Sequence, residues 1–479
     1  MKRHFVSVVS GLTILIAMFI TFGLGATPAK ATTTYQVATD STFPPFEFAN
    51  SHNKYVGIDI DLLHAIAKDQ GFKVNIKPTS FNSAVQSVQS GQADGVIAGM
   101  SITKEREATF DFSKPYFMSG VVMAAKPNGK ITKLSQLRGK RVAVKTGTSG
   151  AQYAQSIHKK YGFRIVTFDE SNDMYQDVLT GNSAACFEDS PVMKYAVRQG
   201  TKLKIYTKPT LNGPYGFAVK KGHNKKLLRM FNNGLADLKS NGEYARITRH
   251  YLGAKGSSDT TSDRTFLGLL KQNKGALLNG FEQTVWLTVV AIFFATLFGV
   301  IVGLLGVVPN KFFNGLSTTL IYIFRGLPLL VLALFIYTGI PSLTGSKIPA
   351  FVAGTITLMF NEGAYIAAFV KGGINAVDDG QMEAARSLGL PFGKSMRRII
   401  LPQGIRIMIP SFINQFIITL KDTSILSIIG IIELTQTGKI IIARNLEGFK
   451  VWTIIAIIYL IVITLLTWLS NWVERRIRL

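Results

Sequence analysis

Five long apolar stretches in the second half of the chain constrain its fold more than any other feature of the sequence. Each is close to the length of about 20 residues that a helix needs to cross a bilayer. They cover residues 281–308, 316–340, 351–370, 405–429 and 451–472. We therefore expect residues 266–479 to form an all-α transmembrane bundle of five helices.

The basic residues indicate how these helices are oriented. The net charge of +25 could indicate nucleic-acid binding. In the second half, however, the basic residues lie beside the apolar stretches, mostly on the side that the positive-inside bias places in the cytoplasm. We therefore expect membrane lipid as a partner and no nucleic acid. Lys439, Arg444 and Lys450 would lie on the outer side, which a half-buried loop or a short helix would explain.

The N-terminal residues 1–31 have the layout of a secretory signal peptide. A basic start is followed by an apolar run at residues 5–24 and by Ala29-Lys30-Ala31, which matches a small-residue cleavage site. The apolar run is also long enough for an uncleaved anchor helix, and the cleavage site favours removal. In either case the following residues lie outside the cytoplasm, and the chain is a multi-pass protein of the plasma membrane.

The first half, at residues 32–253, alternates strand-like and helix-like patterns. Residues 35–39, 74–77 and 96–98 read as strands, and residues 60–70 carry apolar positions at helical spacing. Such alternation predicts an α/β fold with parallel strands, and the length allows two lobes. A ligand would then bind between the lobes at the carboxyl ends of the strands. A Gly/Ser/Thr/Asp-rich segment at residues 254–265 predicts a flexible tether to the membrane half.

Charged and aromatic residues follow several of these predicted strands. They are Asp40, Phe43, Arg106, Lys145 and Asp189. An arginine can hold a carboxylate with two parallel hydrogen bonds, an acid can pair with an amine, and a ring offers an apolar surface. Each residue alone is more often a surface or turn residue. Their shared position just after strands predicts a site for a zwitterionic amino acid.

Metal and thiol chemistry find no support in the sequence. Cys186 is the single cysteine, so an internal disulfide or a thiolate metal site is excluded, and a small buried residue is expected. The six histidines show no H-x-x-x-H spacing. We expect no metal, no cofactor and no catalytic residue.

A polar, basic and helix-forming stretch at residues 377–402 separates two apolar stretches. Residues 381–388 predict a short helix that Gly389 ends. Such a helix on a cytoplasmic loop suits insertion into a groove of another protein. Gly393-Lys394-Ser395 matches the end of a phosphate-binding loop, but Leu388 stands where an earlier glycine is required, so we expect no nucleotide site of this kind.

Both halves resemble components of ABC importers for amino acids. The first half resembles the extracellular binding proteins of the polar-amino-acid (glutamine-like) branch through VATDSTFPPFEF, GIDIDLLHAIA, AGMSITKEREATFDFSKPYF and VAVKTGTSG. The second half is similar to EAA-loop permeases through GQMEAARSLG, FRGLPLL, AYIA, KGGI and KDTS. The resemblance implies an α/β two-lobed clamshell followed by a type I importer permease. The chain would cross between the lobes near residues 120–123 and return near residues 211–217.

The resemblance also implies a role for each site residue. Arg106 would hold the substrate α-carboxylate, helped by Ser101 and by the backbone at Gly99 and Thr148. Asp189 would hold the α-amino group, Phe43 and Phe81 would sandwich the side chain, and Asp40 and Lys145 would contact its far end. Glutamine or a similar polar amino acid is the expected ligand. Glu188 stands at a position where the family varies, which leaves the specificity open.

The resemblance further implies the partners of the chain. A separate ATPase would dock at Glu383, Ala384, Ala385 and Gly389, so this chain is not itself an enzyme. The implied assembly is a homodimer of this chain with two ATPase copies, and the EAA loop and the C-terminus lie in the cytoplasm.

Two other functions and one local question stay open at this point. A ligand-gated channel of the glutamate-receptor kind uses the same clamshell, but its spans are inserted within it. A clamshell enzyme such as a periplasmic dehydratase has no need of five spans. Within the third apolar stretch, Asn361 and Glu362 could face a translocation path or pair with Arg325.

Overall fold

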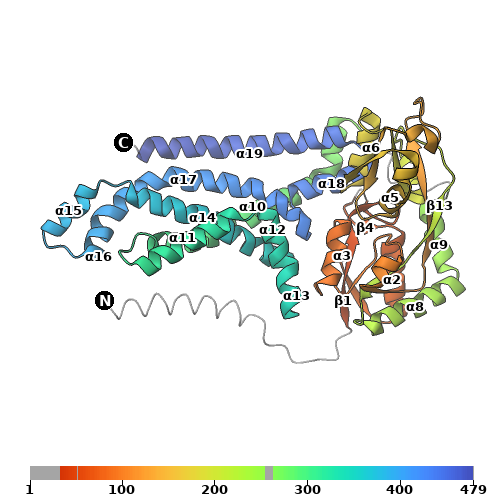
Figure 1. The fold of residues 1–479 in the computed structure, drawn as a ribbon, viewed down its shortest axis with the longest axis horizontal. Coiled ribbons are helices and arrows are strands. Elements are labelled where there is room, and N and C mark those ends of the chain that lie inside the picture. Colours follow the sequence, from red (N-terminus) through yellow and green to blue (C-terminus); the bar gives the residue numbers. More distant parts are fainter. Residues whose placement is uncertain (1–32, 51, 254–262, 478–479) are drawn as a thin grey trace.

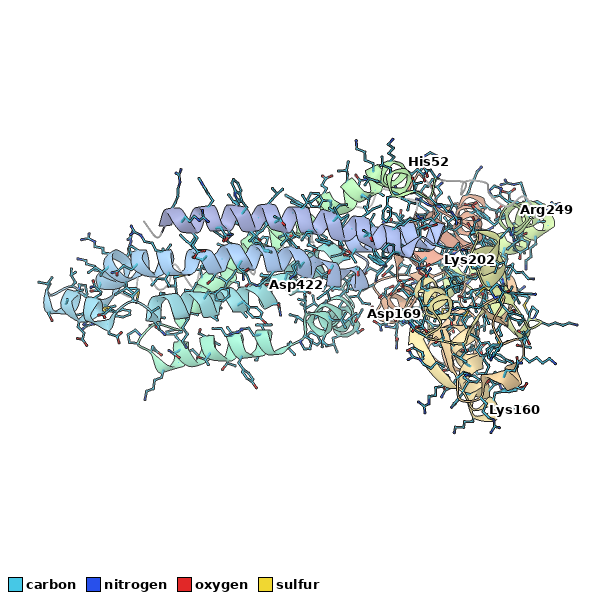
Figure 2. The ribbon with its side chains drawn as sticks, turned by 90° about the horizontal axis from the view of Figure 1, so that it is seen from above. His52, Lys160, Asp169, Lys202, Arg249 and Asp422 are labelled. Carbon is cyan, nitrogen blue, oxygen red and sulfur yellow. The ribbon has the colours of Figure 1, made fainter. Side chains whose placement is uncertain are left out.

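The computed structural model describes residues 33–50, 52–253 and 263–477. Figure 1 shows an α/β body at one end of the molecule and a bundle of long helices extending from it. The view from above in Figure 2 shows the same division, with Asp422 on the helical bundle and Lys160 and Arg249 on the α/β body. The predicted signal peptide and most of the predicted linker lie outside the described residues.

The first lobe of the body is built on a five-stranded sheet in the order β5-β1-β6-β14-β7. Its strands are β1 (Thr34–Asp40), β5 (Lys73–Thr79), β6 (Gly95–Val96), β7 (Phe110–Phe112) and β14 (Ala218–Lys220). The strand β1 runs parallel to both of its neighbours. A small sheet of β2 (Thr42–Phe43), β3 (Glu47–Ala49) and β4 (Tyr55–Val56) follows β1.

The helices of the first lobe are α2 (Ile58–Asp69), α3 (Phe81–Gln89), α4 (Lys104–Glu107), α8 (Lys225–Ser240) and α9 (Glu243–Leu252). On α2, Ile58, Leu62 and Ile66 recur at intervals of four residues and therefore lie on one face. All three are fully buried and contribute to the core of this lobe. The spacing predicted from sequence for this helix is thus confirmed.

The second lobe has a sheet in the order β10-β9-β11-β8-β12, with β13 also paired to β8. Its strands are β8 (Phe117–Ala125), β9 (Arg141–Lys145), β10 (Arg164–Phe168), β11 (Ala185–Asp189), β12 (Lys204–Ile205) and β13 (Thr210–Tyr215). Its helices include α5 (Ser149–Tyr161), α6 (Ser171–Thr180) and α7 (Ser190–Arg198). All five residues of β11 are buried, among them Cys186, which packs in the core as expected.

Two antiparallel strands connect the lobes. The start of β8 pairs with the end of β13, with Phe117 opposite Tyr215 and Ser119 opposite Gly213. The expected first crossing at residues 120–123 is wrong by a few residues, because Val121 to Ala124 already pair with β11 inside the sheet of the second lobe. The expected return at residues 211–217 includes the observed crossing. Two adjacent strands form a hinge about which the lobes can close.

The helical bundle contains each of the five predicted apolar stretches. Its long helices are α10 (Phe266–Leu305), α11 (Lys311–Gly326), α14 (Ala350–Asn375), α17 (Leu401–Asp422) and α19 (Gly448–Ile477). Among the described residues, three helices are long and apolar enough to cross a membrane, or four if α11 and the following segment Leu329–Thr344, bent by 98°, form one span. The helix α14 is not among them, and it carries Asn361 and Glu362 in its middle while packing between α10 and α17.

The bent segment after α11 consists of α12 (Leu329–Leu334), the π-helix η2 (Phe335–Gly339) and α13 (Ile340–Thr344). Further along the chain, α15 (Asp379–Ser387), α16 (Phe392–Ser395) and the π-helix η3 (Met396–Ile400) form the polar stretch before α17. The short helix predicted at residues 381–388 is present and begins two residues earlier. Gly389 ends it with a φ of 80°. Figure 1 places α15 at the end of the bundle far from the α/β body.

Glycines on α10 allow α10 and α14 to pack closely. A Cβ atom on Gly299 would lie 2.6 Å from the Gly363 carbonyl oxygen, and one on Gly303 would lie 2.6 Å from Val370. A Cβ atom on Gly363 would in turn lie 2.6 Å from Phe298. Small residues at a membrane helix interface let backbones approach in this way.

We expect Gly299→Ala to destabilise the bundle by about 1–3 kcal/mol, because the added methyl group overpacks the interface with α14. The measurement is thermal unfolding of the detergent-solubilised chain. Gly275→Ala is the matched control, because Gly275 lies on the same helix with nothing within 4 Å of its Cβ position. Equal stability of the two variants would contradict the packing described here.

Candidate functional site

All nine residues predicted to bind the substrate line one cavity between the two lobes. The first lobe contributes Asp40, Phe43, Phe81, Gly99, Ser101 and Arg106, and the second contributes Lys145, Thr148 and Asp189. The cavity measures about 10 Å³, which is room for about one water molecule. The lobes are therefore closed on each other, and the polar groups of the site largely contact one another.

An ion pair joins the lobes at one side of this cavity. Lys145 Nζ lies 2.6 Å from Asp40 Oδ2, and both side chains are only 2% exposed. Asp40 Oδ1 accepts hydrogen bonds from the Thr42 backbone N–H and hydroxyl, each at 3.0 Å. Burial alone would lower the pKa of Lys145, but the negative charges of Asp40 and other nearby acids raise it overall. Lys145 is thus held in its charged form.

Arg106 connects the lobes at another side of the cavity. It lies on the short helix α4, and Nη1 donates to the Ser101 carbonyl oxygen at 3.0 Å. Its Nη2 donates to the carbonyl oxygen of Gly147 in the second lobe. The guanidinium also lies over the Phe81 ring, with 5.3 Å between its carbon and the ring centroid. A carboxylate that entered the site would replace these carbonyl partners with a charged one.

Asp189 ends β11 and supplies an acid without a cation partner among the described side chains. Its Oδ2 accepts a hydrogen bond from the Tyr215 hydroxyl at 2.6 Å. Its Oδ1 is buried and has no hydrogen-bond partner within the described ranges. Burial, and then the charge of Glu188, raises the pKa of Asp189 to about 7. An ammonium group at Oδ1 would satisfy this oxygen and favour the ionised form.

The two aromatic residues and two glycines shape the cavity. Lys145 Nζ lies 5.1 Å from the centroid of the Phe43 ring. A Cβ atom on Gly99 would lie 2.7 Å from that ring, and one on Gly147 would lie 3.3 Å from the Phe81 ring. Both glycines also have positive φ angles, 52° and 73°. Any larger residue at these positions would be strained and would crowd the neighbouring ring.

Thr148 also has a structural role that its sequence position did not predict. It is the N-cap of α5, where its Oγ1 accepts from the Ala151 N–H at 3.4 Å and donates to the Lys145 carbonyl oxygen at 2.7 Å. Its hydroxyl is therefore occupied within the turn. The Ser101 hydroxyl is also occupied, because it forms a hydrogen bond with the Ser149 hydroxyl across the cleft.

Several buried residues around the site were missed from sequence. Glu170 accepts a hydrogen bond from the Thr42 hydroxyl across the cleft. Asp59 Oδ2 accepts from the Gly99 N–H at 2.8 Å and from the Tyr116 hydroxyl at 2.7 Å, so it holds the Gly99 turn. Glu170 follows β10, so the rule that ligand residues follow strands would have found it. Asp59 lies inside a helix and gives no such signal.

Glu188, whose position in the family leaves the specificity open, does not line the cavity. Its carboxylate accepts hydrogen bonds from the Ser171 hydroxyl at 2.8 Å, the Tyr175 hydroxyl at 2.9 Å and the Asp189 N–H at 2.9 Å. It is 1% exposed and faces the interior of the second lobe. Its influence on a ligand is through the charge and position of Asp189.

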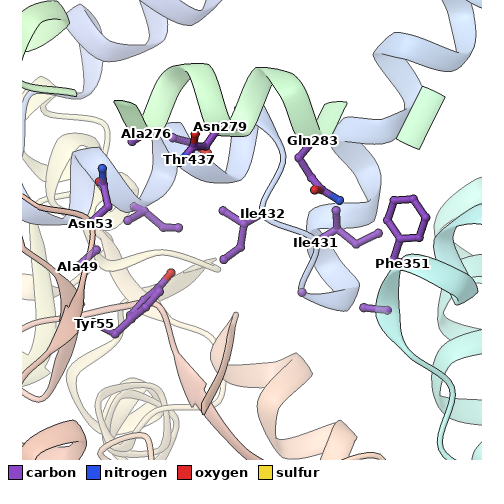
Figure 3. Close-up of a pocket in the computed structure, with 14 residues that line it drawn as sticks. Ala49, Asn53, Tyr55, Ala276, Asn279, Gln283, Phe351, Ile431, Ile432 and Thr437 are labelled. Carbon is purple, nitrogen blue, oxygen red and sulfur yellow. The ribbon is translucent and has the colours of Figure 1, made fainter. Parts of the chain in front are cut away.

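A second cavity of about 440 Å³ lies between the α/β body and the bundle (Figure 3). Its walls come from the β3–β4 region, α10, the start of α14 and the segment around α18 (Leu434–Asn445). Polar members of its lining are Asn53, Tyr55, Asn279, Gln283 and Thr437, and none of the lining residues is charged. The Tyr55 hydroxyl has no hydrogen-bond partner among the described groups. Nothing in the sequence analysis pointed to this cavity, because its walls are far apart in the chain.

In the bundle, Glu362 and Arg325 have separate partners. Gln415 donates to the Glu362 carboxylate, and the Asn361 amide donates to the Phe324 carbonyl oxygen at 3.2 Å. The Arg325 guanidinium lies 4.8 Å from the centroid of the Tyr365 ring. Asn361 and Glu362 therefore do not pair with Arg325, which was one of the two alternatives left open by the sequence.

The four residues expected to contact an ATPase lie on or next to α15. Glu383, Ala384 and Gly389 are exposed to solvent. Ala385 is 2% exposed and faces the protein's own helices, so it supports α15 from within. The next apolar residue, Leu388, is 82% exposed. An exposed leucine beside an exposed acid provides a surface suited to a partner protein.

Known proteins match both halves of the chain. Bacterial extracellular solute-binding proteins, family 3, match residues 35–254, and the binding-protein-dependent transport system inner membrane component matches residues 295–479. The glutamine transport system permease protein GlnP of Escherichia coli (strain K12) is 34% identical over 204 residues, covering 42% of this chain and 93% of that protein. ABC transporter arginine-binding protein 1 of the same organism is 30% identical over 240 residues, covering 49% and 96%.

A solved structure, the substrate binding domain 2 of Lactococcus lactis GlnP in an open conformation, is 44% identical and covers 48% of this chain and 99% of that chain, with a TM-score of 0.38. Together, the two-lobed body and the apolar helices define a class of protein in which a solute receptor and a permease share one chain. The chain belongs to the binding-protein-dependent transport systems, as a family 3 solute-binding protein fused to an inner membrane component. The resemblance expected from the sequence is confirmed.

If Asp189 holds an ammonium group, ligand affinity should fall about tenfold between pH 8 and pH 6, because a carboxyl with a pKa of about 7 loses most of its charge over that range. Calorimetric titration of the full chain with an amino acid at several pH values measures this. Asp189→Asn should bind more weakly at all pH values and show a flatter profile. An unchanged pH profile in that variant would assign the titration to another group.

Proposed function

We propose that this chain is the receptor and translocation subunit of an amino-acid ABC importer, and that its solute is a polar amino acid, with glutamine as the best candidate. The observation that carries the proposal is the charge arrangement of the interlobe cavity. Arg106 suits an α-carboxylate, and the unpartnered oxygen of Asp189 suits an α-ammonium group. The names of the relatives, which include glutamine and arginine transport components, agree with this solute class.

The Asp40–Lys145 pair supports a neutral amide as the side chain of the solute. A carboxamide can accept a hydrogen bond from the lysine with its oxygen and donate one to the aspartate with its nitrogen. It therefore satisfies both charged partners without adding a charge to a buried site. A cationic side chain would lie beside the positive charge of Lys145, and an anionic one would lie beside the negative charge of Asp40. Each would therefore bury two like charges next to each other.

Arginine is the second candidate, because two further acids besides Asp40 lie near Lys145. Asp40, Glu170 and Glu188 all act on the charge of that lysine. Removing the lysine would leave this acidic group without its internal cation, which would favour a basic solute.

We therefore expect Lys145→Met to weaken glutamine binding at least about tenfold and to raise the affinity for arginine, since an uncompensated buried carboxylate costs several kcal/mol unless a cation replaces the lysine. Calorimetric titration of the full chain with both amino acids tests this. Lys159→Met, an exposed lysine on α5, is the control. If the Lys145 variant and the parent chain bind glutamine with equal affinity, the ion pair has no role in glutamine binding.

For the membrane half, we propose that the receptor lies outside the cell and that α15 and the C-terminus lie in the cytoplasm. The opposite ends of the bundle occupied by the α/β body and by α15 support this orientation (Figure 1). We further propose a homodimer of this chain that binds two copies of a separate ATPase through α15. The large cavity of Figure 3, with its uncharged lining, suits a neutral solute on its way from the receptor into the bundle.

Glu383→Arg should abolish most solute-stimulated ATP hydrolysis in the reconstituted transporter, because it reverses an exposed charge on the proposed docking helix. We expect a loss of about tenfold or more, with solute affinity unchanged. The control is Glu282→Arg, which reverses an exposed charge on α10 far from α15. Retention of full ATPase activity in the Glu383 variant would rule out this docking role.

A further inference from the structure

The short helix α18, between the segment η4 (Thr423–Ile429) and α19, carries Lys439 and Arg444, two of the three cations that the positive-inside bias did not explain. Arg444 donates to the Asn50 carbonyl oxygen in the first lobe and to the Asn273 side chain on α10. The third, Lys450, lies in the first turn of α19, pairs with Glu447 at 2.9 Å and donates to the Arg264 carbonyl oxygen at 2.7 Å. These basic residues therefore lie on the side of the receptor because they bind the first lobe and the segments next to it.

Near its N-terminal end, α18 contacts the first lobe. Gln436 Nε2 donates to the Ser41 hydroxyl at 3.1 Å. The first lobe has further contacts with the bundle that do not involve α18. Gln92 exchanges three hydrogen bonds of 2.8 Å with the backbone of Tyr337 and Ile348, and Asp94 pairs with Lys347 at 2.7 Å. The first lobe is thus fixed to the membrane half at several points.

The second lobe contacts α18 through an acidic edge and an apolar residue. Lys439 lines a small cavity together with Glu170, Asn172 and Asp173. Burial raises the pKa of Asp173, and the positive charge of Lys439 partly opposes that rise. Leu446, at the C-cap of α18, packs against the core of this lobe. A further polar contact of this lobe comes from Arg264, which donates to the Gln199 carbonyl oxygen at 2.6 Å.

These two sets of contacts are adjacent only because the lobes are closed. Thr42, next to Ser41 in the first lobe, donates to Glu170 in the second lobe directly beside α18. Opening the hinge would move Glu170 and Asp173 away from Ser41. A single rigid helix could not then contact both lobes.

On its other side, α18 is fixed to two long helices of the bundle. The backbone N–H of Leu434, the first residue of α18, donates to Thr284 Oγ1 of α10 at 3.1 Å. Its N-cap residue Glu433 accepts a hydrogen bond from the Tyr459 hydroxyl of α19 at 3.2 Å. A Cβ atom on Gly438 would lie 2.1 Å from Ile455 of α19. A displacement of α18 is therefore transmitted to α10 and α19.

We propose that α18 detects closure of the receptor, with Ser41 of the first lobe and the acidic edge Glu170–Asp173 of the second lobe as its two contact points and Lys439 as the residue that distinguishes closed from open lobes. The inference rests on the proposed importer function and deepens it by naming the surface through which a loaded receptor acts on the membrane half. The first lobe stays fixed, and the second lobe completes the contact when the cleft closes.

The test uses the chain reconstituted with its ATPase. Lys439→Glu should lower solute-stimulated ATP hydrolysis at least about fivefold while leaving solute affinity unchanged. Adding Asp173→Lys to this variant should restore stimulation to within about twofold, because the two charges are exchanged. Lys274→Glu, an exposed lysine on α10, is the control. Full stimulation in the Lys439 variant, or no recovery in the double variant, overturns the inference.

A second arm makes the result independent of the identity of the solute. Ser101→Cys with Ser149→Cys places a disulfide across the cleft, where the two hydroxyl oxygens are in contact. The only native cysteine, Cys186, is buried and does not interfere. The oxidised chain should stimulate ATP hydrolysis without solute, and adding Lys439→Glu should abolish that stimulation. Absence of stimulation in the locked chain, or its persistence with Lys439→Glu, overturns the closure role of α18. Failure of the unlocked parent chain to respond to any amino acid would instead overturn the proposed solute class.

Discussion

The buried ion pair between Asp40 and Lys145 is the interaction on which the closed arrangement of the two lobes depends. Each charge comes from a different lobe, and neither can stay buried without a partner at low cost. Opening the cleft exposes both to water, and closing it requires that they find each other or a ligand that replaces the partner. The same pair thus governs closure, the position of Thr42 beside it, and the contacts that Thr42 makes with the second lobe.

Closure in turn determines what the membrane half can contact. The first lobe is held by contacts that do not change with the cleft, such as those of Gln92 with the backbone near α13. The second lobe approaches the bundle at Lys439 and Leu446, and these positions depend on the hinge at β8 and β13. A receptor attached to its own permease therefore does not have to search for a docking partner. What changes on solute binding is the conformation of the receptor, open or closed.

The sequence predicted the lobes, the apolar stretches and the residues of the cavity because each has a local signal. Asp40, Lys145 and Asp189 stand at the carboxyl ends of strands, and the glycines of α10 recur at helical spacing. Contacts between residues far apart in the chain have no such signal. Ser41 and Gln436 are separated by 395 positions, so the sequence alone gave no reason to bring them together. For the same reason Lys439 read as an exception to a membrane rule, although it faces acids of the receptor.

The length of α10 has a mechanical consequence. Its 40 residues span about 60 Å, roughly twice the thickness of the hydrocarbon core. A helix of this length that crosses the bilayer once extends well beyond it, and the N-terminal part of α10 carries Asn273, which contacts Arg444 of α18. Because each residue of a helix turns it by about 100°, inserting one residue between the two parts would rotate the outer end away from α18, whereas inserting seven would nearly preserve its direction and raise it by about 10 Å. The number of residues in one uninterrupted helix thus sets both the height and the orientation of the α10 surface that contacts α18 beneath the receptor.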